Sequence, residues 1–174
     1  MVQRIDFRRF FIVFHNKLII QTDKRINFYD ITDNAVKIQT KSEIKSGIMT
    51  IYSQHTTCSV FIQEQSNDVD YWGTQFILQD MVNGLEKIFP KCNTIGQYLH
   101  PGPLHIKIAE DERNEKAFWS LNTDAHLRSV LLGRSVCIPI EDQKLQLGEF
   151  GRIYFVDFDQ VRERERIVRI FIMG

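Results

Sequence analysis

Residues 47–64 read GIMTIYSQHTTCSVFIQE, two apolar runs on either side of the polar sequence QHTT. Both runs are rich in β-branched and aromatic residues, which favour strands, and the second run alternates between two kinds of side chain. The sequence therefore predicts strands at 47–54 and 58–64, with His55 where they join.

The chain before this pair predicts two strands and a helix. Residues 4–21 are again rich in aromatic and β-branched side chains, and they fit a hairpin that turns at 15–17. Asp30 can cap a helix, and apolar residues follow it at helical spacing. We expect that helix to end near 46–47.

The chain after the pair predicts two helices and three strands. An apolar stripe marks a helix that ends at Pro90, and residues 122–132 form a shorter helix stopped by Gly133. Between them lie a loop-like segment and a charged stretch, 110–116, for which no structure is predicted. The predicted strands are 134–140, 152–159 and 165–173.

This order of elements indicates an α+β fold, with mixed or antiparallel sheets and about three helices packed against them. The length of 174 residues fits one domain, 1–174. The chain has neither the phosphate-loop motif G-x-x-x-x-G-K-[ST] nor a strand-linked G-x-G-x-x-G, so it lacks the two commonest nucleotide-binding signatures.

Composition excludes several classes of protein. With 43% hydrophobic residues the chain is not intrinsically disordered, and 22 basic against 22 acidic side chains give no excess positive charge for a nucleic-acid partner. The longest apolar run, 10–14, is too short for a membrane span or a signal peptide. Three widely spaced cysteines without a C-x-x-C motif suggest reduced thiols, and we expect a cytoplasmic protein.

Three of the five histidines, His55, His100 and His126, lie in polar, turn-rich sequence. Imidazole can ligate a metal or carry protons near neutral pH. The separations of these histidines match no compact metal motif, so spacing alone leaves a second interpretation open, in which each is a surface or structural residue.

His126 falls in the first turn of its predicted helix. The unpaired backbone amides there favour an anion such as phosphate, and the positive end of the helix lowers the proton affinity of the imidazole. The alternative is that Asp124 caps the helix and His126 points to water.

The sequence RERER at 162–166 alternates charge at period two. On a strand this places Arg162, Arg164 and Arg166 on one face, which continues as the apolar Val168 and Ile170. Arginines at the rim of a core need carboxylate or phosphate partners. A solvated turn, in which arginine and glutamate neutralise one another, is the alternative.

Glu64 ends the strand 58–64 on its apolar face, so we expect a partly buried carboxylate there. It could act as a base, a metal ligand or an arginine partner. If the two strands form a simple hairpin, His55 and Glu64 lie roughly 20 Å apart at about 3.3 Å per residue. A neighbouring subunit could then complete a site that contains both.

Several stretches together resemble the YjbQ-like family: SQHTTCSV at 53–60, QE at 63–64, YLH at 98–100 and NTDAHLRSVLLG at 122–133. The likeness continues through 138–140, 145–148 and 158–159 into the arginine run, and it covers most of the chain from about residue 23 to residue 174. The order of the motifs is specific, although each alone is weak.

This resemblance implies a homotrimer with histidine-lined sites near the subunit interfaces. It also implies a weak thiamine-phosphate synthase activity, in which a thiazole phosphate displaces pyrophosphate from a hydroxymethylpyrimidine. Such chemistry usually uses a divalent cation, here zinc or magnesium. The alternative is a non-catalytic trimer that binds a metal or a phosphorylated metabolite.

Position by position, the resemblance implies catalytic roles for His55, Glu64 and His126, and metal ligation by His55, His100 and His126. The implied substrate contacts are Thr56, Thr57, Asp124, Arg162, Arg164 and Arg166. Where the family has Gly-Thr-Trp-Gln, this chain has Gly-Glu-Phe-Gly at 148–151. That change removes two hydrogen-bonding side chains and adds a charge, so the identity of the substrate stays open.

Overall fold

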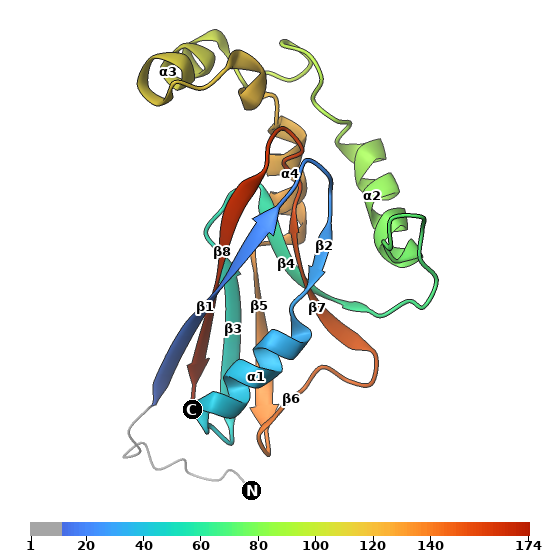
Figure 1. Cartoon of the computed structure of the whole chain (residues 1–174), viewed down its shortest axis with the longest axis vertical. Helices are drawn as coiled ribbons and strands as arrows, with labels where there is room; N and C mark the ends of the chain where they lie inside the picture. The colour runs from blue at the N-terminus through green and yellow to red at the C-terminus, as the bar shows by residue number, and fades with distance from the viewer. Residues whose placement is uncertain (1–11) are drawn as a thin grey trace, which may run out of the picture.

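The computed structural model describes residues 12–174. Figure 1 shows two groups of strands flanked by helices at both ends. The elements in chain order are β1 (Val13–Thr22), β2 (Phe28–Asp30), α1 (Thr32–Ser42), β3 (Gly47–Ser53), β4 (Cys58–Glu64), α2 (Phe76–Ile88), α3 (Pro103–Arg113), the 3-10 turn η1 (Ala117–Ser120), α4 (Thr123–Leu132), β5 (Ser135–Glu141), β6 (Lys144–Leu145), β7 (Gly151–Asp157) and β8 (Arg164–Met173).

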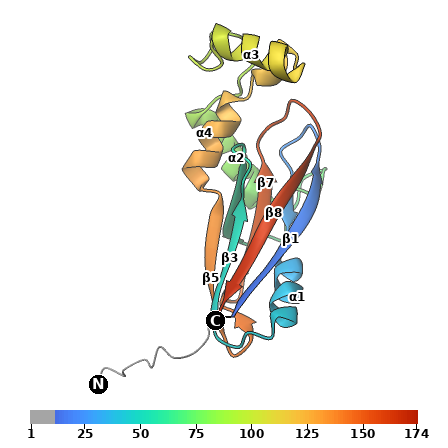
Figure 2. The same cartoon turned by 90° about the vertical axis from the view of Figure 1, so that its left-hand side faces the viewer.

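The strands form two sheets, one of five strands in the order β1-β8-β3-β5-β6 and one of three in the order β2-β7-β4. Every strand pairing in the described part of the chain is antiparallel. Figure 2 shows β5, β3, β8 and β1 of the larger sheet side by side. The α+β class is therefore confirmed, with four helices where about three were expected.

β3 and β4 follow one another in the chain, as predicted, but they do not form a hairpin. β3 pairs with β5 and β8 in the larger sheet, and β4 pairs with β7 in the smaller one. The segment 54–57 therefore carries the chain from one sheet to the other. Its polar residues lie where the two sheets meet.

The prediction of a hairpin that turns at 15–17 is wrong. β1 runs straight through these residues and pairs with the whole of β8, from Val13 opposite Met173 to Thr22 opposite Arg164. Asn16 and Lys17 favour a turn locally, but ten consecutive pairings with β8 outweigh that preference. Most of the first strand of that hairpin, within 4–14, lies outside the described residues.

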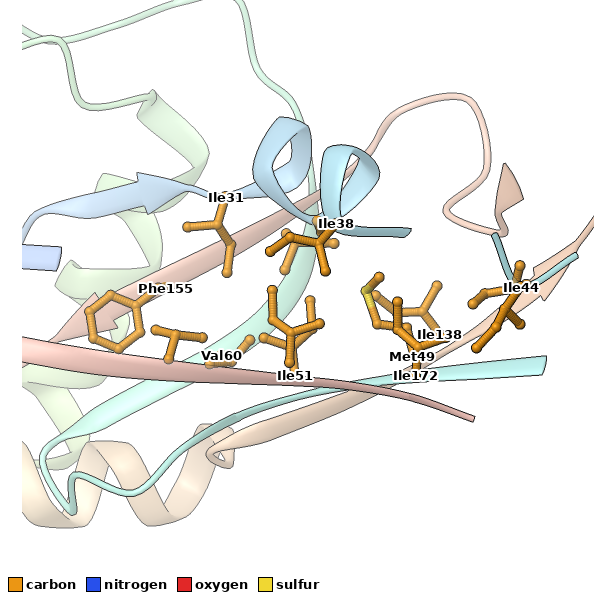
Figure 3. Close-up of a cluster of buried hydrophobic side chains, with 14 of the residues drawn as sticks. Ile31, Ile38, Ile44, Met49, Ile51, Val60, Ile138, Phe155 and Ile172 are labelled. Atoms are coloured by element: carbon orange, nitrogen blue, oxygen red, sulfur yellow. The ribbon is translucent and has the colours of Figure 1, made fainter. Parts of the chain in front are cut away.

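The core fills the space between the two sheets and α1, as Figure 3 shows. Strand β3 contributes Met49 and Ile51, both fully buried, while Ile48 points to the other face and is 46% exposed. Gly47 opens this strand because a Cβ there would lie 2.1 Å from the carbonyl oxygen of Met173. The remaining buried members are Ile31, Ala35, Ile38, Ile44, Cys58, Val60, Ile138, Ile140, Ile153, Phe155, Val168, Ile170 and Ile172.

The helices gather at opposite ends of the sheets. Figures 1 and 2 show α1 at one end and α3 beyond the strands at the other. The helix α3 was not predicted, because its 11 residues carry five charged side chains and only Ala109 is fully buried. Pro103 begins it, since proline lacks the N–H that a first helical residue cannot use.

The structure confirms the other predicted helices, although their ends and buried residues differ from those predicted. α1 already ends at Ser42, where Glu43 adopts a left-handed conformation. α2 buries Leu78, Val82 and Leu85, and Ile88 of the expected stripe is 60% exposed. No helix in the part of the chain that the structure describes is long and apolar enough to cross a bilayer.

Candidate functional site

Polar residues meet at the end of the sheets that lies under α3 and α4. Here β3 ends, β4 begins, β7 ends and β8 begins. A cavity of about 360 Å³ opens at this end. Its lining residues are Gln54, His55, Thr56, Thr57, His105, Arg113, Glu115, Trp119, Ser120, Asn122, His126, Arg162, Arg164 and Arg166.

The three arginines of the period-two run all line this cavity. Arg164 and Arg166 lie on the face of β8 that continues into the core through Val168 and Ile170, and Arg162 lies in the bend before the strand. Each guanidinium has a carboxylate partner. Arg166 Nε lies 2.6 Å from Asp157 Oδ2, and Arg164 Nη2 lies 2.7 Å from Asp159 Oδ2. The structure therefore places Arg164 and Arg166 at the edge of the core, as the strand interpretation predicts. Arg162 lies in the bend before β8 and pairs with Glu115 instead of a glutamate of the run, so neither interpretation holds for all three arginines.

Thr57 fixes the deepest of these arginines. Its buried hydroxyl donates to Asp157 Oδ1 at 2.8 Å and accepts from Arg166 Nη2 at 3.1 Å. Arg166 itself is 6% exposed. Thr57 was expected to touch substrate, but its hydroxyl is already committed to positioning Arg166, whereas its neighbour Thr56 is exposed to the cavity.

Arg162 and Arg164 keep donors that face no acceptor. Arg162 binds the Glu115 carboxylate through Nη2, and its guanidinium carbon lies 4.4 Å from the Trp119 ring centroid. Among the described residues, the Nε atoms of Arg162 and Arg164 are buried and have no hydrogen-bond partner, and no partner is found for their Nη1 atoms either. Burial, together with the charges of Arg166 and Arg162, lowers the pKa of Arg164. An incoming anion would relieve that repulsion.

His126 brings a proton-accepting nitrogen to the same cavity. Its Nδ1 lies 3.2 Å from the carbonyl oxygen of Thr56, which fits the tautomer with the proton on Nδ1. Nε2 is then free to accept a proton or a hydrogen bond. Burial is the main cause that lowers the pKa of His126, with a further contribution from Arg164. The imidazole is therefore neutral at pH 7.

His100 and His105 lie against His126. The ring of His100 lies 4.5 Å from that of His105 and 6.0 Å from that of His126, measured between centroids. Burial and the neighbouring His105 and His126 lower the pKa of His100. His105 is not among the three histidines that the sequence singles out, because the helix α3, which carries it to the cavity wall, is not recognisable from the sequence.

His55 lines the cavity, and Nε2 accepts the backbone N–H of Ile167 at 3.1 Å. The neutral ring then carries its proton on Nδ1, which lies 3.4 Å from Arg166 Nη1. No lone pair of this ring is left for a metal ion. In residues 12–174 no three histidine, cysteine, aspartate or glutamate side chains are grouped to hold a metal. The histidines of one chain therefore do not fit the metal ligand set that the resemblance implies.

Asp124 and Glu64 lie away from the cavity lining. Asp124 is 3% exposed and accepts the N–H of Cys92 at 3.0 Å, with Arg128 Nη2 at 3.4 Å, and burial raises its pKa. It stabilises the packing of α4. Glu64 is exposed, so its predicted partial burial is wrong, because β4 extends past the core and Ile62 is already 41% exposed. Strand β4 separates Glu64 from the cavity end by roughly 20 Å.

Comparison with known proteins gives the same family over nearly the whole chain. Residues 16–174 match the family model described as UPF0047 protein YjbQ-like. A UPF0047 protein of Archaeoglobus fulgidus is 32% identical over 153 residues, which are 88% of this chain and 98% of that protein. The UPF0047 protein YugU of Bacillus subtilis is 27% identical over 153 residues, 88% of this chain and 96% of its own length.

Solved structures share the fold. A YbjQ-like protein of unknown function from Sulfolobus solfataricus superposes with a TM-score of 0.72 at 22% identity, covering 95% of this chain and 99% of that one. A YjbQ/UPF0047 protein of Clostridium acetobutylicum has a TM-score of 0.68 at 29% identity, with 90% and 98% covered. The sequence motifs, the two antiparallel sheets and these matches agree, and the chain belongs to the YjbQ-like UPF0047 family.

Proposed function

We propose that the cavity binds a phosphorylated small molecule and that the protein is a phosphate-handling enzyme of the thiamine-phosphate-synthase type. The observation that carries this proposal is the meeting of two part-free guanidinium groups, Arg162 and Arg164, with the free Nε2 of His126 in one cavity. The resemblance supplies the candidate reaction. The geometry supports anion binding and charge stabilisation.

Phosphate oxygens suit the free donors better than a carboxylate does. A guanidinium presents N–H groups in a planar fork, and a phosphate offers several oxygens that can take donors from more than one arginine. Four arginines line the cavity, whereas three carboxylates, those of Glu115, Asp157 and Asp159, contact arginines among them. The balance leaves one net positive charge, which favours an anionic ligand.

The proposed reaction needs charge stabilisation more than a base. A ring nitrogen of the thiazole phosphate forms a bond to the methylene carbon of the pyrimidine as the bond from that carbon to the pyrophosphate oxygen breaks. The departing oxygen keeps the electron pair, and donors fixed in a partly buried cavity stabilise it. Arg162 and Arg164 fit this role, and His126 can hydrogen-bond the bound anion once it is protonated.

A second candidate is a protein that binds phosphorylated metabolites without turnover. The observation that favours it is that every arginine of the 162–166 run already has a carboxylate partner, which is typical of a rigid binding site. Both candidates predict pyrophosphate binding. Only the enzyme predicts product.

The test is an assay with the two phosphorylated precursors. We expect slow formation of thiamine phosphate by the wild-type chain and at least tenfold less by Arg164→Ala. Pyrophosphate binding without any product would favour the binding protein. Absence of both product and pyrophosphate binding would contradict the proposal.

We further propose that three copies assemble through the outer face of the five-stranded sheet. On this face Val13, Ile19, Ile48, Phe171 and Met173 are between 37% and 59% exposed. They form an apolar surface that another copy can bury. The proposal also includes a cytoplasmic location and no nucleic-acid partner. The three cysteines form no disulfide, which agrees with a cytoplasmic location.

A further inference from the structure

Glu115 is the one carboxylate among the described residues that line the cavity, and it lies between α3 and η1. Its two oxygens contact different arginines. Oε1 accepts from Arg162 Nη2, and Oε2 lies 3.6 Å from Arg113 Nε. A carboxylate of this chain therefore occupies arginine donors on the cavity wall that an anionic ligand would use.

The other two carboxylates are held in a different way. Asp157 and Asp159 are almost completely buried, and each accepts a backbone N–H as well as an arginine: Asp157 from Asp159, and Asp159 from Val161. Within residues 12–174 the side chain of Glu115 contacts only the two arginines, and it is 20% exposed. The helix before it buries only Ala109 fully. Glu115 can leave its position at a lower cost than the aspartates can.

We infer that Glu115 is a competitor for the anion site, displaced when the ligand binds, and that it selects for multiply charged phosphates. The inference rests on the proposed function. A monoanion gains no more from Arg162 than the carboxylate it replaces, whereas a pyrophosphate brings more charge and more oxygens. Trp119 keeps Arg162 in place after Glu115 leaves, because the guanidinium lies 4.4 Å from the Trp119 ring centroid.

Calorimetric titration with inorganic pyrophosphate and with acetate tests the inference. Glu115→Gln keeps the size of the side chain and removes its charge. We expect this variant to bind pyrophosphate at least fivefold more tightly than the wild type, and to bind acetate where the wild type does not. Glu112→Gln, an exposed position on α3, removes the same charge nearby and is expected to change the affinity less than twofold.

A double-mutant cycle separates competition from a general charge effect. In an Arg162→Ala background the Arg162 contact of Glu115 is gone and only its longer contact with Arg113, at 3.6 Å, remains, so Glu115→Gln is expected to change pyrophosphate affinity less than twofold. An equal gain in both backgrounds would overturn the inference, and so would unchanged or weaker binding by Glu115→Gln alone. If that variant does not fold, Glu115→Asp withdraws the carboxylate from Arg162 and is expected to tighten binding in the same direction.

The two proposals fail in different ways. A wild-type chain that binds no pyrophosphate would contradict the proposed function and the inference with it. A wild-type chain that binds pyrophosphate, with Glu115→Gln no tighter, would contradict the inference alone.

Discussion

Arg164 and His126 concentrate the chemistry of the cavity at the scale of single residues. Arg164 is held by Asp159 at 2.7 Å, and its Nε has no hydrogen-bond partner among the described residues. His126 is fixed through Nδ1 and presents Nε2. The pKa of each group is lowered for the same reasons, because each is partly buried and lies close to other cationic groups. An anion in the cavity is expected to raise both pKa values.

This coupling predicts a pH dependence of anion binding. Because bound anion raises the pKa of His126, binding takes up a proton, and the affinity rises as the pH falls. Sulfate is the suitable probe, since it stays a dianion throughout. We expect wild-type affinity for sulfate to increase between about pH 7.5 and about pH 6, the interval around the ordinary histidine pKa. The increase should be much smaller in His126→Asn, and equal pH profiles of the two proteins would contradict it.

The same pKa shifts predict how stability changes with pH. His55, His100 and His126 all have a pKa below the ordinary value of 6.5 in the folded chain. Below about pH 6.5 the unfolded chain therefore binds more protons than the folded one, and the free energy of unfolding falls as the pH drops toward about 5. Urea unfolding across this range checks the direction, and sulfate is expected to reduce the loss. Stability that rises as the pH drops would contradict it.

At the scale of elements, the segment 54–57 connects the two sheets and also lines the cavity. It carries the chain from β3 to β4, and its carbonyl at Thr56 orients His126 while its hydroxyl at Thr57 orients Arg166. The polar ends of β7 and β8 supply Asp157 and Arg164 at the same place. A substitution in this segment is therefore expected to affect both the stability of the fold and the geometry of the site.

Thr57→Val tests the structural part of that role. Valine keeps the shape of threonine and removes the hydroxyl, which leaves Asp157 and Arg166 each short of a buried partner. We expect a loss of about 1–3 kcal/mol in the free energy of unfolding, measured in urea. Thr56→Val is the matched control, because this side chain is exposed, and it should change stability by less than about 0.5 kcal/mol. Equal effects of the two substitutions would contradict this account.

Patterns that repeat along one element were predictable from sequence, and relations between elements were not. Arg164 and Arg166 were placed correctly because their period-two alternation continues into buried Val168 and Ile170, whereas the bend at Arg162 has no such signal. The separation of β3 and β4 into two sheets has no local signal, since a hairpin and a sheet crossing share the same pattern. His105 was missed because α3 has little apolar periodicity. Glu64 was wrongly predicted to be partly buried because β4 extends past the core.

At the scale of the whole molecule, the proposed trimer predicts a mass of roughly 60 kDa, three times the chain mass of 20.5 kDa. Phe171→Glu places a charge in the middle of the outer sheet face and is expected to shift the mass toward that of the single chain. Val36→Glu, at an exposed position of α1, is the control and should leave the mass unchanged. Light scattering over a range of dilutions measures the mass of the wild type and of both variants. A wild-type mass of about 20 kDa throughout would contradict the trimer.

The central claim is that the arginines lining the cavity bind a phosphate-bearing ligand. Titration of the intact protein with inorganic pyrophosphate tests this claim most directly. We expect saturable binding by the wild type and binding at least tenfold weaker, a loss of about 1.4 kcal/mol, by Arg164→Ala. Arg152→Ala, whose ion pairs with Asp30 and Asp33 lie outside the cavity lining, should bind within twofold of the wild type. Absence of wild-type binding, or equal losses in the two arginine variants, would contradict the claim.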